Sequence, residues 1–499
     1  MRARACLHIL SGLLPLLLWV ISLPASAGAQ ELASRVDAIL GADPWDRVHW
    51  GLLLAELEAG EVLYQRNARI RFAPASNMKF PVTIAALARL GPDFRYETAF
   101  YTDAPPGPDG RISGDLVLPG RGDPTLGEPF HDSADAALEA LADSLLAAGV
   151  REVGGALRID ASAWDSTSVP TGWLVGNLPN RAAATGGAFG IGMGELEIEI
   201  TGGAAPGDPA RVSWRPMGTG SFVESRIRTV GPGGEVEIDY GYLPESRRWL
   251  LEGTIAPGAR RSMTRAQRDP VRQAAHALYR AIEGRGIRIE GGVEVVWERE
   301  ASPGGGCDGS RVERCPAMVR VAGVTSPTLL EITAEVMGAS QNWIAEQLVR
   351  TLGAEFGEEG SWDEGFQVIT ETLVDAVGVD SMDLYFRDGS GLAGYNLVSP
   401  EALVAMLRWA RMEPWGEGYL RTMAEPGRDR TTLQSRLPEL RGRLFAKTGT
   451  ITHTTTLSGY LTADDGRELV FVIFSNASNL PASAMRPAID RITREFARP

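Results

Sequence analysis

The chain has 499 residues, a length that corresponds to about three domains. It is 44% hydrophobic and 22% charged, which is typical of a packed globular protein. The formal net charge of −14 argues against a nucleic-acid-binding protein, which would need a basic face, and identifies no other partner.

The N-terminal segment has the pattern of a secretory signal peptide. A basic start precedes an apolar run (residues 13–23), and two small-x-small cleavage sites follow, Ala25-Ser26-Ala27 and Ala27-Gly28-Ala29. The run is short for a membrane span, and an uncleaved anchor is the alternative interpretation. We therefore expect residues 1–29 to be a signal peptide and the mature protein to be exported, either soluble or peripheral to the membrane.

The next segment predicts two strands and a helix. The stretch HWGLLLAELEAGEVLYQRNA indicates two strands around a turn at Ala59-Gly60. PASNMKFPVTIAALARLG then has helical spacing, with Pro81 in the first turn and Gly91 at the end. Ser76 thus lies at the start of a helix, and Lys79 lies one turn further on, on the same side.

From about Tyr96 the pattern changes to short strands with Gly and Pro turns. ELEIEITGG alternates strictly, as a half-buried strand does, whereas PVRQAAHALYRAIEGRGI predicts a helix that stops at a glycine. We expect residues 96–324 to be an inserted β-rich region. The pattern leaves open whether this region forms one module or two.

Helical character returns in SQNWIAEQLVRTLG, and three strands follow near the C-terminus, with Asp465-Gly466 at the second turn. A last helix is predicted from about Ala482 to Phe496. Residues 30–95 and 325–499 are therefore expected to form one α/β domain that the insertion splits.

Two cysteines, Cys307 and Cys315, lie in the polar, Gly-rich stretch GGGCDGSRVERCP. In an exported protein this arrangement favours an intrachain disulfide, with two free thiols as the alternative. No histidine lies near them in sequence, so a metal site is not expected there.

The two lysines are the first indication of chemistry. Of 49 Lys plus Arg residues, only Lys79 and Lys447 are lysines. A serine hydroxyl needs a base, and a lysine one turn from Ser76 can serve if its pKa is lowered, whereas an arginine stays protonated. In AKTGT, the Lys447 ammonium and the Thr448 hydroxyl can hold a carboxylate, and Gly449 lets a ligand approach the backbone. We expect Lys447 to stay charged.

A third pattern opens a helical segment in ASQNWIAEQL. Ser340 can relay a proton, and the Asn342 amide can hold a peptide carbonyl and a lysine together. Helix N-capping is the alternative reason for these residue types at that place.

In this order, S-x-x-K, S-x-N and K-T-G form the signature set of penicillin-binding proteins and serine β-lactamases. The long gap from Lys79 to Ser340 resembles the class C low-molecular-mass penicillin-binding proteins, the D-alanyl-D-alanine carboxypeptidase/endopeptidase family. GDLVLPGRGDPTL, DGSGLAGYNLVSPEALVAML and RLFAKTGTITHTTTLSGYL also look like family stretches. The resemblance implies an α/β (α+β) penicillin-binding-protein or serine β-lactamase-like transpeptidase fold, and neither cofactor nor metal. It also implies two inserted, nested β-rich domains, which we expect at about 96–165 with 285–324 and at about 166–284.

The resemblance also implies a mechanism. Ser76 attacks the carbonyl of the penultimate D-alanine, and Lys79 accepts the serine proton. Ser340 carries that proton toward the leaving amine, and Asn342 positions the substrate and Lys79.

The remaining residues implied by the resemblance bind substrate. Lys447 and Thr448 receive the terminal carboxylate, beside Gly449, and the backbone N–H groups of Ser76 and Thr450 form an oxyanion hole. Asp160 matches an acidic position that in some members touches the diamino-acid side chain of the substrate.

The expected partners are peptidoglycan peptides and, as covalent inhibitors, β-lactam antibiotics, in the periplasm or cell envelope. Ala393-Gly394-Tyr395 stand where the family commonly has a serine and an arginine after DGSGL, which leaves side-chain specificity open. A β-lactamase or esterase on the same scaffold and a non-catalytic cell-wall binding protein are the alternatives.

Overall fold

The computed structural model describes residues 27–216, 223–231, 233–243, 245–246, 248–298 and 318–498. Most of the predicted signal peptide, and both Cys307 and Cys315, lie outside these residues. Within the described ranges, no helix is both long enough and apolar enough to span a bilayer.

A five-stranded antiparallel sheet forms the centre of the catalytic part, in the order β19-β20-β21-β1-β2. Its strands are β1 (His49–Glu56), β2 (Val62–Arg66), β19 (Leu444–Ile451), β20 (Thr454–Thr462) and β21 (Glu468–Asn476). β1 pairs along its whole length with β21, so the two ends of the chain complete one sheet. The two N-terminal strands and the three C-terminal strands predicted from the sequence are confirmed.

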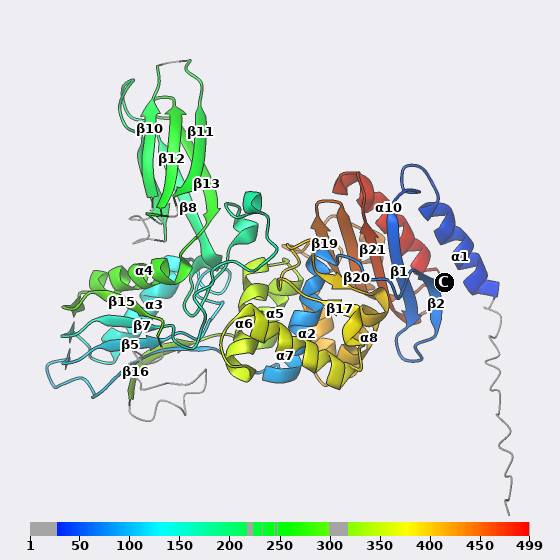
Figure 1. Cartoon of the computed structure of the whole chain (residues 1–499), viewed down its shortest axis with the longest axis horizontal. Helices are drawn as coiled ribbons and strands as arrows, with labels where there is room; N and C mark the ends of the chain where they lie inside the picture. The colour runs from blue at the N-terminus through cyan, green and yellow to red at the C-terminus, as the bar shows by residue number, and fades with distance from the viewer. Residues whose placement is uncertain are drawn as a thin grey trace, which may run out of the picture.

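Helices cover both faces of this sheet (Figure 1). One face packs against α1 (Ala27–Leu40) and α10 (Ala482–Phe496). The other face packs against α2 (Lys79–Leu90), α5 (Leu329–Met337), α6 (Asn342–Phe356), α7 (Trp362–Thr372), α8 (Pro400–Met412) and α9 (Gly416–Thr422). α10 has the bounds that the sequence predicts, and α2 ends where Gly91 takes a φ of 87°, which favours glycine.

Short elements connect the helices on the second face. They are the 3₁₀ turns η1 (Ala75–Met78), η9 (Ser381–Asp383) and η10 (Pro438–Leu440), the π-turn η8 (Leu373–Val377), and the two-stranded ribbon of β17 (Leu384–Tyr385) and β18 (Leu397–Val398). η1 leads directly into α2, and the loop between β17 and β18 approaches it, as described below.

The inserted region begins with a mixed five-stranded sheet in the order β15-β7-β5-β3-β16. Its strands are β3 (Glu97–Thr102), β5 (Leu116–Pro119), β7 (Leu157–Asp160), β15 (Val293–Val296) and β16 (Val319–Thr325). α3 (Ala134–Ala147) and α4 (Pro270–Gly284) pack on it and share its apolar core. A small parallel sheet of β4 (Arg111–Ile112), β6 (Glu152–Val153) and β14 (Arg288–Ile289) lies at its side.

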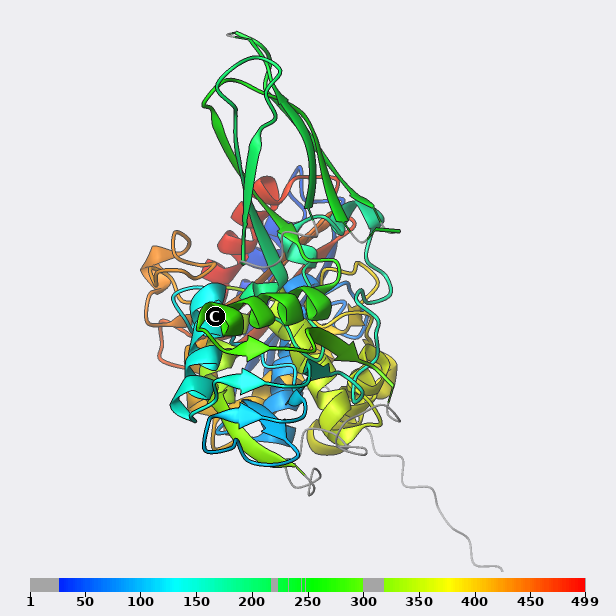
Figure 2. The same cartoon turned by 90° about the vertical axis from the view of Figure 1, so that its left-hand side faces the viewer.

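Two further three-stranded sheets enclose a separate apolar core, and this module projects away from the rest of the molecule (Figure 2). They comprise β8 (Glu195–Thr201), β9 (Arg211–Arg215) and β13 (Arg260–Ala266), and β10 (Val223–Thr229), β11 (Glu237–Leu243) and β12 (Arg248–Ile255). The alternating burial of β8 confirms its sequence pattern. α4, which the sequence grouping placed with these strands, instead shares the core of α3. The domain boundaries stay a prediction.

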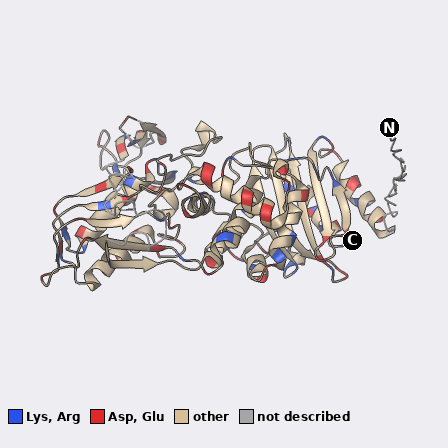
Figure 3. Cartoon of the chain, turned by 60° about the horizontal axis from the view of Figure 1, so that its bottom comes forward, with Lys and Arg blue, Asp and Glu red and all other residues tan. Residues whose placement is uncertain are grey.

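Three short 3₁₀ turns lie in the segment between β7 and β8: η2 (Val175–Asn177), η3 (Arg181–Ala183) and η4 (Gly192–Gly194). This segment runs from the inserted sheet toward α6 and forms the junction with the catalytic part. Charged residues of both signs are interspersed over all parts of the described chain (Figure 3).

Candidate active site

Ser76 lies in η1, on a turn that the surrounding chain holds under strain. Ala75, the residue before it, has a φ of 46°, which a non-glycine residue adopts only when its neighbours enforce it. A Cβ at Gly391 would overlap the Ala75 carbonyl, and a Cβ at Gly449 would lie 2.9 Å from Ser76 N. Two glycines therefore let the β17–β18 loop and strand β19 press against the backbone that presents Ser76. This is a second reason for Gly449, besides the ligand approach expected from the sequence.

Lys79 begins α2, and its side chain returns along the helix toward Ser76. The Lys79 Nζ lies within hydrogen-bonding distance of three oxygens, namely Ser76 Oγ at 3.0 Å, Asn342 Oδ1 at 2.7 Å and the Ser390 carbonyl at 2.8 Å. The amide oxygen and the carbonyl are acceptors only, whereas the serine hydroxyl can also donate. A neutral amine has two N–H donors and one lone pair. The two pure acceptors take the two donors, so the lone pair is left for the Ser76 hydroxyl.

The pKa of Lys79 fits this neutral form. Burial lowers it from 10.5 to about 7, and the carboxylates of Asp388 and Glu346 oppose that shift. Lys79 has no exposed surface, so desolvation outweighs the attraction of two anions. A lysine that is half deprotonated near neutral pH can accept a proton from serine.

The second lysine meets the second serine. Lys447 Nζ donates to Ser340 Oγ at 2.7 Å and to the Thr448 carbonyl at 2.9 Å. Burial, and to a lesser extent the positive charge of Lys79, hold the pKa of Lys447 well below its ordinary value, which weakens our expectation that it stays charged. Ser340 has a φ of 67°, so its backbone, like that of Ala75, is held in a strained conformation.

Asn342 is the first residue of α6, and both the oxygen and the nitrogen of its side-chain amide form hydrogen bonds. Oδ1 accepts from Lys79, and Nδ2 donates to the Ala182 carbonyl at 2.8 Å, which comes from the inserted region. Gln341, not Asn342 or Ser340, occupies the N-cap position and makes no side-chain cap. The N-capping alternative is therefore wrong, and the pattern S-x-N serves the site.

Several buried residues that support this site carry no signal in the sequence. Asn77 donates to the Lys447 carbonyl at 2.8 Å and accepts from Ser458 Oγ at 2.7 Å, which ties the turn of Ser76 to β19 and β20. Asp388 accepts from the Gly391 and Ala393 backbones and from Trp173 of the inserted region. A serine-lysine motif points to neither residue, because their partners lie far away in the chain.

The five predicted catalytic residues therefore lie together, and an open cleft of about 570 Å³ beside the edge strand β19 reaches two of them, Ser76 and Ser340. The cleft is lined by Ser76, Ser340, Thr448, Gly449, Thr450, Thr455, Thr432, Ser435, Arg436, Ser483, Arg486, Pro487 and Asp490. Polar side chains dominate this wall, as a peptide substrate with a charged end requires. The oxyanion role of Ser76 and Thr450 stays a prediction.

Asp160 lies elsewhere. It ends β7 in the inserted sheet, is 5% exposed and accepts a hydrogen bond from the Ser162 backbone. It is not among the residues that line the cleft. Its predicted contact with a substrate side chain stays a prediction.

Comparisons with known proteins agree with this geometry. The model of the D-Ala-D-Ala carboxypeptidase 3 (S13) family matches residues 32–496. A D-alanyl-D-alanine carboxypeptidase of Actinomadura sp. (strain R39) is 32% identical over 99% of this chain and 91% of its own length. The D-alanyl-D-alanine carboxypeptidase DacB of Haemophilus influenzae is 21% identical over 85% of each chain.

The crystal structure of penicillin binding protein 4 (dacB) from Haemophilus influenzae has a TM-score of 0.76 at 21% identity, over 93% of this chain and 98% of that one. It confirms the fold expected from the resemblance. The three motifs assembled in the structure, the family match along nearly the whole chain and the relative at 32% identity lead to one conclusion: the chain belongs to the D-Ala-D-Ala carboxypeptidase 3 (S13) family and is a serine-type D-Ala-D-Ala carboxypeptidase.

Proposed function

We propose that the enzyme cleaves peptidoglycan stem peptides, and cross-links of the same chemistry, through an acyl-enzyme on Ser76. Ser76 Oγ forms the new bond to the carbonyl carbon of the penultimate D-alanine while its proton passes to Lys79. The C–N bond to the leaving residue then breaks, and Ser340 passes its hydroxyl proton to the departing amine while the proton held by Lys79 replaces it. Water hydrolyses the ester and regenerates Ser76.

The observation that carries this proposal is the buried contact between Lys79 Nζ and Ser76 Oγ at 3.0 Å. Both other acceptors of Lys79 are fixed, so its lone pair is directed to the nucleophile. The contact of Lys447 with Ser340 supports the proposed proton transfer by Ser340, because a buried amine beside the hydroxyl can donate to its oxygen. A relative of the same fold was crystallised with a β-lactam, and we propose that β-lactams likewise acylate Ser76.

Labelling with a fluorescent penicillin tests this function. The wild type should acquire the label and release D-alanine from a pentapeptide, and Ser76→Ala should do neither, because no nucleophile remains. Ser262→Ala, at an exposed position of β13, is the matched control and should label like the wild type. Equal labelling of Ser76→Ala and the wild type would sink the assignment of the nucleophile.

Digestion of purified cross-linked muropeptides, read by mass, separates the two activities. Loss of a terminal D-alanine defines the carboxypeptidase activity, and cleavage of the cross-link defines the endopeptidase activity. Failure of the wild type in both reactions, with labelling intact, would favour the binding-protein alternative. Rapid release of a hydrolysed penicillin would favour the β-lactamase alternative. The signal-peptide pattern supports the proposal that this work takes place in the periplasm or cell envelope.

The rate of acylation should depend on pH through Lys79. Its pKa is lowered to about 7, so below that pH the ammonium form predominates and has no lone pair for the serine proton. The second-order rate constant for acylation should therefore rise about tenfold per pH unit below the pKa and level off above it. Stopped-flow quenching of protein fluorescence by a β-lactam, between pH 5 and about pH 9, measures this limb. A rate that is flat across pH 7 would contradict the role of Lys79 as base.

A further inference from the structure

We propose that Glu346 is a positioning residue for Lys79: it fixes the β17–β18 loop so that the Ser390 carbonyl directs the lysine lone pair at Ser76, and it supplies a negative charge beside the ammonium that forms. This inference rests on the proposed function. It assigns a part in proton transfer to a side chain that touches neither the substrate nor Ser76.

Glu346 is built into the site as a carboxylate. It lies on α6 four residues after Asn342, hence on the same face of the helix, and it has no exposed surface. Its two oxygens accept three hydrogen bonds, from Ser390 N, Gly389 N and Trp362 Nε1, each at 2.8 Å. All three partners are donors, which is the arrangement that a carboxylate needs, because a protonated acid would require an acceptor for its own O–H.

The loop that Glu346 holds is the one that Lys79 uses. Two consecutive N–H groups, of Gly389 and Ser390, point to the carboxylate. These N–H groups lie just before the Ser390 carbonyl, which accepts from Lys79 Nζ at 2.8 Å. Gly391, the next residue, packs against the Ala75 carbonyl. Glu346 therefore holds the two residues that lead into this acceptor of the base and into the glycine that supports the strained nucleophile turn.

Asp388, the second buried carboxylate, holds the same loop through other groups. Its oxygens accept from the backbone of Gly391 and Ala393 and from the side chains of Asn396 and Trp173. These contacts close the loop on itself and on the inserted region. The Gly391 N–H, which Asp388 accepts, belongs to the same peptide unit as the Ser390 carbonyl, whereas Glu346 holds the two N–H groups before that carbonyl, those of Gly389 and Ser390.

The charges around Lys79 make Glu346 an electrostatic partner as well. The charged or titratable groups that face Lys79 are Glu346 from α6, Asp388 from the loop and Lys447 from β19. Burial and Asp388 raise the pKa of Glu346, and its hydrogen bonds to the loop and Trp362, which favour the ionised form, oppose this rise. When Lys79 takes the serine proton, the new positive charge is desolvated, and an anion on α6 lowers its energy.

Two substitutions separate geometry from charge. In Glu346→Gln, one oxygen is replaced by an NH₂ group, so one backbone N–H loses its acceptor and faces a donor. The Ser390 carbonyl is displaced, and the negative charge is lost. Both effects weaken the ammonium form of Lys79. The plateau rate of acylation should therefore fall at least about tenfold, and the acid limb should move to lower pH.

Glu346→Asp keeps the charge but is too short to reach both N–H groups. It should lower the plateau rate and leave the acid limb closer to that of the wild type. Glu355→Gln makes the same chemical change on the same helix but outside the site. It should change neither the plateau rate of acylation nor the position of the acid limb. Acylation by a fluorescent β-lactam, followed from pH 5 to about pH 9, is the measurement, with the thermal midpoint of each variant as a check of folding.

The outcomes distinguish this inference from the function on which it rests. If the wild type is not labelled, or if Ser76→Ala is, the proposed function fails. If the wild type is labelled and a folded Glu346→Gln keeps both the wild-type plateau and the wild-type limb, Glu346 does not position Lys79. The plateau rate of acylation could fall equally in Glu346→Gln and Glu346→Asp while the acid limb of the pH profile stays in place. Glu346 would then act only through the geometry of the loop, and its negative charge would have no part in proton transfer. If Glu346→Gln does not fold, the plateau of Glu346→Asp alone decides whether Glu346 positions Lys79.

Discussion

Lys79→Arg should abolish the acylation of Ser76 although it preserves the positive charge of the side chain. A guanidinium stays protonated at every pH at which the protein is folded, so it offers no lone pair to the serine hydroxyl. Loss of a general base typically costs between about 10²- and 10⁴-fold in rate, and we expect a loss at the upper end because the serine has no other base within reach of the contacts described. The rate constant for penicillin labelling measures the effect.

Two further variants make the result interpretable. Lys79→Met is neutral and of similar length, so it fits the buried site without a guanidinium and should lose the same activity. Arg89→Lys, the reverse exchange at an exposed position in the last turn of α2, should behave as the wild type. Labelling of Lys79→Arg within a few-fold of the wild-type rate would show that another group accepts the serine proton.

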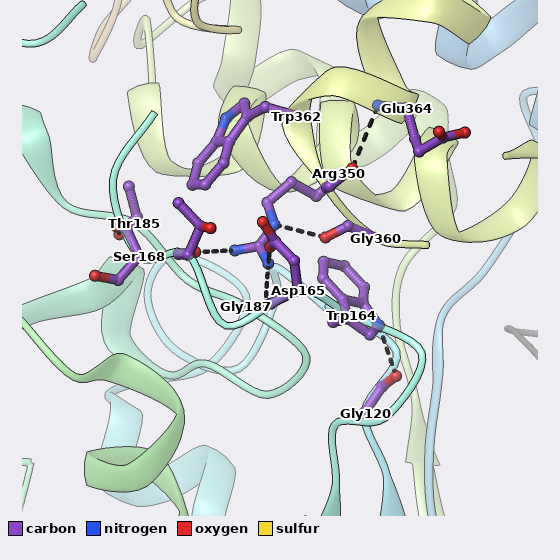
Figure 4. A network of polar contacts seen from close by, with 12 residues as sticks. Gly120, Trp164, Asp165, Ser168, Thr185, Gly187, Arg350, Gly360, Trp362 and Glu364 are labelled. Atoms are coloured by element: carbon purple, nitrogen blue, oxygen red, sulfur yellow. Dashed lines mark hydrogen bonds and ion pairs between the residues drawn. The ribbon is translucent and has the colours of Figure 1, made fainter. Parts of the chain in front are cut away.

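Of the substitutions considered, Arg350→Met should cause the largest loss in the free energy of unfolding. Arg350 lies on α6 with 1% of its surface exposed, and its guanidinium reaches across the junction into the inserted region (Figure 4). It donates to the Gly360 carbonyl, the Thr167 carbonyl and both the carbonyl and the carboxylate of Asp165. Trp164 and Trp362 also pack against it, with their ring centroids 5.2 and 4.6 Å from the guanidinium carbon.

Removal of this guanidinium leaves a carboxylate and three carbonyls without their donor. Burial lowers the pKa of Arg350 to about 10, so the group is still charged at neutral pH and its partners depend on that charge. Breaking a buried pair in this way costs about 3–5 kcal/mol. The midpoint of urea unfolding, followed by tryptophan fluorescence, should fall accordingly.

The matched control is Arg285→Met, which removes an arginine that also bridges two acidic residues, Glu139 and Asp143, but at the surface. Water replaces those contacts, so the midpoint should change little. A shift for Arg350→Met no larger than that of the control would mean that the junction is held by its apolar contacts alone.

The sequence indicated the proposed catalytic residues because the spacing within each motif is local. Ser76 and Lys79 share one helical turn, and the scarcity of lysine in the chain makes Lys79 and Lys447 conspicuous. The strands at both ends of the chain carry clear alternation and turn residues, so their existence was predictable. Their pairing was not, because residues near 49 and near 476 meet only in the folded sheet; the order of the elements predicted only that both ends of the chain belong to one split domain.

The supporting residues lay beyond sequence reasoning for a physical reason. Glu346 is one glutamate in an ordinary helix pattern, and Arg350 is one of 47 arginines. What distinguishes them is burial against partners that come from other parts of the chain, such as Gly389 and Asp165. No periodicity encodes such a meeting. The placement of α4 beside α3 could not be predicted for the same reason. The sequence shows that α4 has an apolar face, but only packing in the folded chain decides which apolar core that face joins.

The pairing of β1 with β21 has a consequence for the order of folding during synthesis. His49 meets Asn476, so the catalytic sheet cannot close until nearly the whole chain has left the ribosome. The inserted sheet with α3 and α4 has its own apolar core and is complete once β16 has emerged. Until β21 has emerged, the edge of the apolar strand β1 that will pair with it stays open and is prone to pair with another chain. The last strands to be made therefore protect the first.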